Sequence, residues 1–196
     1  MKILFATSNE NKANEIRQLL PSTIELITLK DIEINEDIPE TSPTIEGNAK
    51  QKADYITMHF NINCFADDTG LEINALNGEP GVFSARYAGE QRSDTDNMQL
   101  VLDKLPSQDD RSARFKTVIA LNVNDEQYLF EGIVNGTIRT EKTGANGFGY
   151  DPIFEPENCG KTFGEMDMDE KNSYSHRARA IKKMITFMHD RIQPES

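Results

Sequence analysis

Two hydrophobic periods alternate along the chain, and together they predict a mixture of strands and helices. Apolar runs with the length of a strand occur at 2–7, 24–29, 62–66, 71–76, 114–123 and 128–134. Apolar residues at helical spacing occupy 13–20, 42–60, 95–105 and 175–188. The second helix is expected to begin with Ser42 as its cap and Pro43 in its first turn, and Ser175 is expected to cap the last helix.

Composition limits the size of the fold and the kinds of partner. The 196 residues, 37% of them hydrophobic, are enough for one well-formed core or two small lobes that share a core, and we expect a single domain over 1–196. The net charge of −12 argues against a protein that grips a nucleic acid polymer, although a small anionic ligand needs only a local basic cluster.

The cysteines and the N-terminus indicate a cellular compartment. Cys64 and Cys159 match no zinc spacing and are expected to be reduced thiols. The sequence predicts neither a signal peptide nor a membrane-spanning segment, so we expect a cytoplasmic protein without membrane contact.

Asp67 and Asp68 form the most informative polar feature of the chain. They follow an apolar run, at 62–66, and precede Thr69 and Gly70. Two adjacent carboxylates at the end of a buried strand repel each other unless a cation or several donors hold them, which favours a divalent metal. The alternative is an ordinary turn between two strands, because Asp, Thr and Gly are all good turn residues.

Two further segments could contact an anionic ligand. The loop 7–12 joins a core strand to a helix, so its free amides and Lys12 suit a phosphate, although Ser8 or Asn9 could simply cap the helix. Asn48 and Lys52 are four residues apart and share one helical face, which either reads a ligand or is solvated.

The segment 144–152 combines glycines with aromatic rings. The glycines allow a close approach of the backbone, Phe148 and Tyr150 offer rings for stacking on a base, and Asp151 is a polar group beside them. His176 and Arg177 lie in the first turn of the last helix, where cations oppose the helix dipole unless an anion or a nucleobase carbonyl compensates them.

Five short motifs occur along the chain in an order that resembles a known protein family. They are Thr7–Lys12, Ala66–Leu71, Ser84–Tyr87, Gly147–Phe154 and Ser175–Arg177. Together they resemble the inosine triphosphate pyrophosphatase family, whose members hydrolyse dITP, ITP and XTP to the monophosphate and pyrophosphate. The resemblance covers essentially the whole chain and implies an α/β fold with a long curved mixed β-sheet, flanking helices and two lobes that form a nucleotide cleft.

The resemblance also implies a Mg²⁺ cofactor, a homodimer and a role for individual residues. Glu40 and Asp68 would bind Mg²⁺, and Asp68 would also activate the attacking water. The residues that would bind the substrate are Thr7, Ser8, Asn9, Glu10, Asn11, Lys12, Lys52, Thr69, Phe148, Gly149, Tyr150, Asp151, Lys171, His176 and Arg177. Thr69 stands where many bacterial relatives have Ser, and the sequence leaves open whether Asp67 shares the metal.

Two other functions are compatible with parts of this pattern. One is a Maf-like pyrophosphatase acting on modified or pyrimidine nucleotides, against which the His176–Arg177 pair argues. The other is a nucleotide sensor that binds without turnover, against which Asp68, Lys12 and Lys52 together argue. Hydrolysis in the presence of Mg²⁺ distinguishes an enzyme from a sensor.

Overall fold

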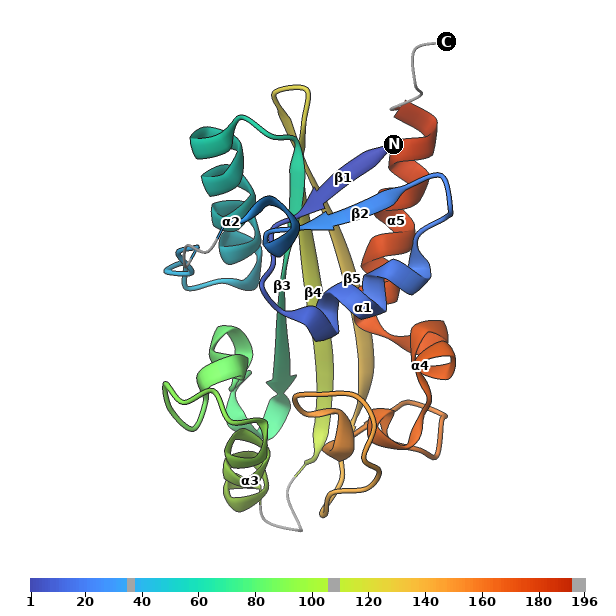
Figure 1. Ribbon diagram of the computed structural model, residues 1–196. Coiled ribbons are helices and arrows are strands. Elements are labelled where there is room, and N and C mark those ends of the chain that lie inside the picture. Colours follow the sequence, from blue (N-terminus) through green and yellow to red (C-terminus); the bar gives the residue numbers. More distant parts are fainter. Residues whose placement is uncertain (35–37, 106–109, 192–196) are drawn as a thin grey trace. The chain divides into compact units, whose positions relative to one another are not determined.

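The architecture is a six-stranded mixed β-sheet with flanking helices, as the family resemblance implies (Figure 1). The computed structural model describes residues 1–34, 38–105 and 110–191. The strands lie in the order β2-β1-β3-β4-β5-β6, and they span Lys2–Phe5, Glu25–Thr28, Cys64–Ile73, Ser112–Val123, Glu126–Ile138 and Phe154–Pro156 in chain order. The helices α1 to α5 span Glu10–Leu19, Ile45–Phe60, Asp94–Lys104, Met168–Tyr174 and His176–Arg191.

The chain divides into two compact units. Unit 1 comprises 1–68, 117–132 and 177–196, and unit 2 comprises 69–116 and 133–176.

Unit 1 has its core on the face of the sheet that α1 and α5 cover. Parallel pairing aligns β1 with both β2 and β3, and Phe5 on β1 stacks on Phe65 of β3 with 4.6 Å between ring centroids. Apolar residues at helical spacing on α1 and α5 pack on these rings: Ala13, Ile16, Ala180, Ile181, Met184 and Met188. α2 lies on the other side of β3 (Figure 1) and buries its own apolar stripe, which includes Ala49, Ala53 and Ile56.

Unit 2 has a separate core. Buried residues of the ends of β3, β4 and β5 pack with α3 and with the segment 150–166, and Phe154 and Phe163 are completely buried there. β6 pairs antiparallel with β5 from Gly136 to Ile138. This core anchors the aromatic segment 148–154.

The structure corrects expectations for β3 and for the start of α2. β3 is continuous from Cys64 to Ile73, so the alternative of a turn after Asp68 is wrong, and so is a separate strand at 71–76. The cap of α2 is Thr44, whose hydroxyl accepts from Gly47 N at 3.0 Å, and not Ser42. Pro43 therefore precedes the helix.

The last part of the chain contains an extra helix. The sequence pattern predicted one helix from Ser175 onward, and α5 does begin at His176. α4 is a separate seven-residue helix before it, and Ser175 is its C-terminal cap. Among the described residues, no helix has the length and apolar character needed to span a membrane.

Candidate active site

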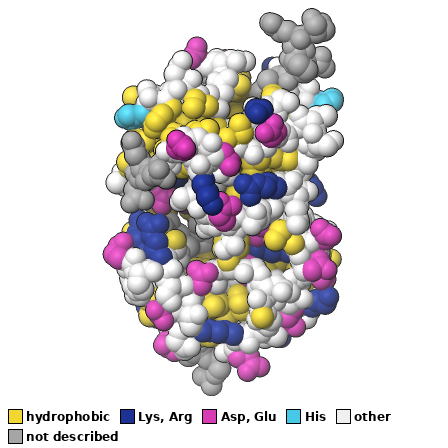
Figure 2. Space-filling view, in the orientation of Figure 1, with side chains coloured by type: hydrophobic (Ala, Val, Ile, Leu, Met, Phe, Trp, Pro, Cys, Tyr) yellow, Lys and Arg dark blue, Asp and Glu magenta, His cyan; other side chains and the backbone are white. Residues whose placement is uncertain are grey.

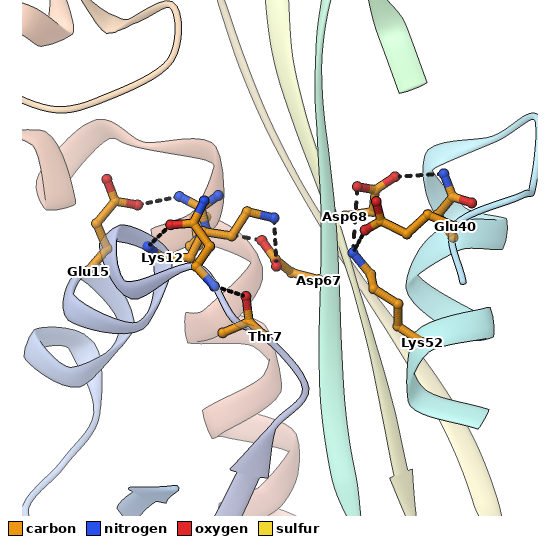
Figure 3. A network of polar contacts seen from close by, with 10 residues as sticks. Thr7, Lys12, Glu15, Glu40, Lys52, Asp67 and Asp68 are labelled. Carbon is orange, nitrogen blue, oxygen red and sulfur yellow. Dashed lines mark hydrogen bonds and ion pairs between the residues drawn. The ribbon is translucent and has the colours of Figure 1, made fainter. Parts of the chain in front are cut away.

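Asp67 and Asp68 point to opposite faces of β3, because successive side chains of a strand alternate (Figure 3). Asp67 faces α1 and α5, whereas Asp68 faces α2. The strand therefore separates the two carboxylates, and each has its own set of partners. The two carboxylates are adjacent in sequence, but their repulsion is reduced because they point in opposite directions and because each has cations nearby.

Asp67 is held by two cations, the half-buried Lys12 and the buried Arg177. Its Oδ1 accepts from Lys12 Nζ at 2.9 Å and its Oδ2 accepts from Arg177 Nε at 3.1 Å. Burial alone would raise the pKa of Asp67, but the charges of Lys12 and Arg177 outweigh burial and hold this pKa well below its usual range. Asp67 is therefore a permanent anion that orients the Lys12 ammonium.

Arg177 extends this network to α1. Its guanidinium is bonded to Asp67 and, through Nη1, to Glu15, and all three side chains are at least 96% buried. The two carboxylates overcome the effect of burial and raise the pKa of Arg177. Breaking such a buried pair by removing one partner typically costs about 3–5 kcal/mol, since the other charge stays buried without compensation.

Asp68 lies in a different environment on the α2 side. Its Oδ2 accepts from Asn48 Nδ2 at 3.2 Å, and its Oδ1 lies 3.8 Å from Lys52 Nζ. Lys52 Nζ also donates to Glu40, so the ammonium draws both carboxylates to one place (Figure 3). Burial raises the pKa of Asp68, and repulsion from Glu40 adds to this effect although Lys52 opposes it.

The carboxylates of Glu40 and Asp68 fit a magnesium ion. Mg²⁺ prefers oxygen ligands and is commonly bound by one or two carboxylates together with water and substrate phosphates. Both carboxylates converge on one cation here, and a nearby positive charge would favour the ionised form of Asp68. Among the described residues, no group of three or more acidic, His or Cys side chains could hold a metal, so such an ion would depend on water and substrate for its other ligands.

The loop 7–12 combines backbone capping with an exposed polar surface. The Thr7 hydroxyl accepts from Asn9 N at 3.1 Å, and Asn9 Oδ1 accepts from Lys12 N at 3.2 Å as the cap of α1. The residues Ser8, Asn9, Glu10 and Asn11 are exposed, while Lys12 is turned inward to Asp67. Capping and ligand binding are thus compatible in this loop.

The second group of predicted site residues surrounds Lys171 in unit 2. Lys171 Nζ donates to Asp151 Oδ2 at 2.6 Å, and it lies 4.8 Å from the ring centroid of Phe148 and 5.6 Å from that of Phe163. Asp151 Oδ2 also accepts from Phe148 N at 2.9 Å. The ammonium is thus held between a carboxylate and two aromatic faces, an arrangement that stabilises a buried cation.

Aromatic residues near this lysine differ in exposure. Phe148 is half-buried, whereas Tyr150 belongs to the core and its hydroxyl donates to Ser84 O at 2.7 Å. Of these two rings, only that of Phe148 has an accessible face on which a ligand could stack. His176 is also buried, and its ring stacks on Phe115 with 4.5 Å between centroids.

The structure groups most of the predicted residues into two sets. Lys12, Lys52, Glu40 and Asp68 lie in unit 1 with the loop 7–12, and Phe148, Gly149, Asp151, Lys171 and His176 lie in unit 2. Thr69 is half-buried and is the first residue of unit 2 on β3. Arg177 belongs to the first set, because its partners are Asp67 and Glu15. The family resemblance implies instead that it binds the substrate near the base.

Sequence reasoning missed two contributors. Glu15 is 3% exposed on the core side of α1, and the signal was a charged residue four positions before Leu19 of the apolar face. Phe163 lies under Lys171 Nζ, and its ring centroid is 6.2 Å from that of His176. Nothing in its local sequence distinguishes it from an ordinary core residue.

Comparisons with known proteins agree with the motifs. The sequence profile of the Ham1 family matches residues 3–187. The chain is 55% identical to the dITP/XTP pyrophosphatase of Flavobacterium johnsoniae, over 96% of this chain and 98% of that protein. It is 46% identical to the dITP/XTP pyrophosphatase of Porphyromonas gingivalis, over 95% of this chain and 97% of that protein.

Solved structures show the same fold. The Ham1 protein of Staphylococcus aureus superposes with a TM-score of 0.88 at 39% identity, covering 97% of this chain and 99% of that chain. A Ham1 protein from Coxiella burnetii gives the same TM-score, identity and coverage.

Proposed function

This chain belongs to the Ham1 family, and from that premise we propose that it is a Mg²⁺-dependent pyrophosphohydrolase of dITP, ITP and XTP. Its role would be to remove deaminated purine nucleotides before they enter DNA or RNA. The observation that carries the proposal is that the two adjacent carboxylates of β3 have different partners. Asp67 orients Lys12, whereas Asp68 lies next to Lys52 and Glu40.

Residues of unit 1 would bind the triphosphate. An ammonium group has three N–H donors, so Lys12 and Lys52 retain donors for phosphate oxygens while bonded to Asp67 and Glu40. The exposed residues of the loop 7–12 add polar groups at the start of α1. Phosphoryl transfer depends chiefly on positioning and on charge neutralisation, which these cations provide.

Asp68 would act as the general base. Burial raises the pKa of Asp68, which favours acceptance of a proton, and a Mg²⁺ ion beside the carboxylate would oppose this effect. The water oxygen bonds to the α-phosphorus, its proton passes to Asp68, and the bond from the α-phosphorus to the bridging oxygen breaks to release pyrophosphate. Mg²⁺ held by Glu40 and Asp68 would neutralise charge on the phosphates.

Residues of unit 2 would select the base. Phe148 offers a half-buried ring for stacking, and Lys171, oriented by Asp151, is a donor suited to the 6-oxo group of hypoxanthine or xanthine. Adenine presents an amino group at that position and would leave the donor unpaired, which costs about 1–3 kcal/mol. The partners of Arg177 favour a role in holding Asp67 over a role in reading the base.

A substrate panel tests the proposal. We expect pyrophosphate release from ITP, dITP and XTP with Mg²⁺, little release from ATP, GTP and dTTP, and none with chelator. A preference for dTTP would instead support a Maf-like activity, and ITP binding without turnover on any substrate would support a sensor. The homodimer implied by the family and the cytoplasmic location expected from the sequence stay predictions.

A further inference from the structure

The loop that carries Phe148 is bonded to the start of α3. Gly149 N donates to Asp94 Oδ2 at 2.7 Å, and Asp94 is the first residue of that helix. Asp94 is exposed and lies 55 positions away in sequence, so local chain geometry does not force this contact. None of the roles proposed above involves α3.

The first turn of α3 is itself firmly attached to its surroundings. Ser93 caps it by accepting from Asp96 N at 3.2 Å. Asn97 is 2% exposed, and its amide group accepts from Ala88 N at 2.7 Å and donates to Ala85 O at 3.1 Å. The Asp94 carboxylate is therefore presented from a fixed support.

Three consecutive residues of the loop have anchors of different kinds. Gly149 is bonded to Asp94, the Tyr150 hydroxyl donates to Ser84 O, and Asp151 accepts from both Phe148 N and Lys171. The Tyr150 and Asp151 anchors are buried, whereas the Asp94 anchor is exposed. The peptide directly after Phe148 thus has two anchors, because its carbonyl accepts from Asp151 N at 3.2 Å within the loop, and its N–H donates to Asp94 outside the loop.

We propose that Asp94 is a positioning residue for base recognition, which fixes the Phe148 ring by holding Gly149 N. The inference rests on the proposed function, since it names the residue that orders the base-binding loop. A carboxylate is the appropriate group because a hydrogen bond from an amide to an ionised acceptor is stronger than one between neutral groups. Phe148 N, the preceding amide, is held in the same way by the Asp151 carboxylate.

Steady-state kinetics with ITP test the proposal. Asp94→Ala should raise KM for ITP roughly tenfold, equivalent to about 1.4 kcal/mol, and leave kcat within about twofold, because Asp68, Lys12 and Lys52 are untouched. Asp94→Asn keeps an acceptor oxygen and should restore most of the affinity. Asp96→Ala is the matched control, since Asp96 is also an exposed acid in the first turn of α3.

Amide hydrogen exchange without nucleotide provides a second readout. The Gly149 amide should exchange faster in Asp94→Ala than in the wild type and in Asp96→Ala. Unchanged KM and unchanged exchange in Asp94→Ala would overturn the inference, as would equal changes in both alanine variants, which would indicate a general effect on α3. Absence of ITP hydrolysis by the wild type would overturn the proposed function, while the exchange experiment would still test the contact.

Discussion

At the scale of the residue, Asp67 and Asp68 are separated in function by one step along a strand. Lys12 and Arg177 lower the pKa of Asp67 against the effect of burial, whereas burial and Glu40 raise the pKa of Asp68. Two carboxylates whose pKa values are displaced in opposite directions are suited to different tasks, one as a fixed counter-ion and the other as a proton acceptor.

Asp68→Asn should therefore abolish hydrolysis while nucleotide binding persists. Loss of a general base typically lowers kcat by roughly 10²–10⁴, and the amide keeps the size of the side chain next to Asn48 and Lys52. Pyrophosphate release from ITP measures kcat, and calorimetric titration with a nonhydrolysable ITP analogue measures binding.

Glu72→Gln is a matched control for this substitution. Glu72 is another carboxylate of β3, half-buried and paired with Arg114 at 2.5 Å, and its neutralisation should leave kcat within about twofold. A kcat near that of the wild type in Asp68→Asn would remove Asp68 from the mechanism.

At the scale of the element, the sequence predicts most helices and strands but not where β3 ends. Asp, Thr and Gly at 67–70 have the residue types of a turn, and local propensity favours that interpretation. The strand continues because Leu71 and Ile73 are fully buried in the core of unit 2 and the two aspartates find cations on opposite faces. Such long-range partners are not visible in a local pattern.

In the candidate site, too, the sequence predicts the individual residues but not their long-range partners. The motifs contain Lys12 and Asp68, whereas Lys52 was predicted from the helical face it shares with Asn48, and Lys171 from the family resemblance. The structure gives each of the four a charged partner. The partners of Arg177 could not be predicted, since Glu15 is 162 positions away in the sequence.

Gly147 and Gly149 of the loop 144–152 are needed for different reasons. Gly147 has φ +74°, and a Cβ there would lie 2.0 Å from Asp151 Oδ2. Gly149 has φ +61°, and a Cβ there would meet nothing within 4 Å. Gly147→Ala should thus displace the carboxylate that holds Lys171, while Gly149→Ala adds only backbone strain of about 1 kcal/mol.

Kinetics and thermal unfolding distinguish these two glycine variants. We expect Gly147→Ala to raise KM for ITP at least roughly tenfold, and Gly149→Ala to raise it less than about fivefold. Both variants should keep kcat near the wild-type value because unit 1 is unchanged. Equal KM values in the two variants would show that the position of Asp151 does not govern base binding.

At the scale of the whole molecule, each unit has its own core and its own cysteine. Cys64 lies in unit 1 with no exposed surface, and Cys159 lies in unit 2 and is half-buried. Because the two thiols lie in different units, they report separately on the opening of the two cores. On the face in view, Figure 2 shows acidic and basic side chains interspersed over the surface, in keeping with a chain whose charges mostly face solvent.

Cys64 should be inert to alkylation until unit 1 opens. Burial raises the pKa of the Cys64 thiol to about 11, although a hydrogen bond with Thr57 opposes this. At pH 8 the thiolate is then roughly a hundredfold scarcer than in an unfolded chain, and the reagent has no access to it. Pulsed iodoacetamide labelling in increasing urea, read by mass spectrometry, should modify Cys159 first.

The raised pKa of Cys64 also predicts that the protein becomes less stable as the pH rises above about 8.5. The folded state keeps the Cys64 proton at pH values where the unfolded chain has released it, so its contribution is complete below about pH 8.5 and is lost as pH rises towards 11. Over that range the free energy of unfolding should fall by about 2–3 kcal/mol more in the wild type than in Cys64→Ala, as measured by urea titration. If the free energy of unfolding changes with pH in the same way in both proteins, the thiol ionises equally in the folded and unfolded states. In the labelling experiment, modification of Cys64 before Cys159 would mean that unit 1 opens while unit 2 is still folded.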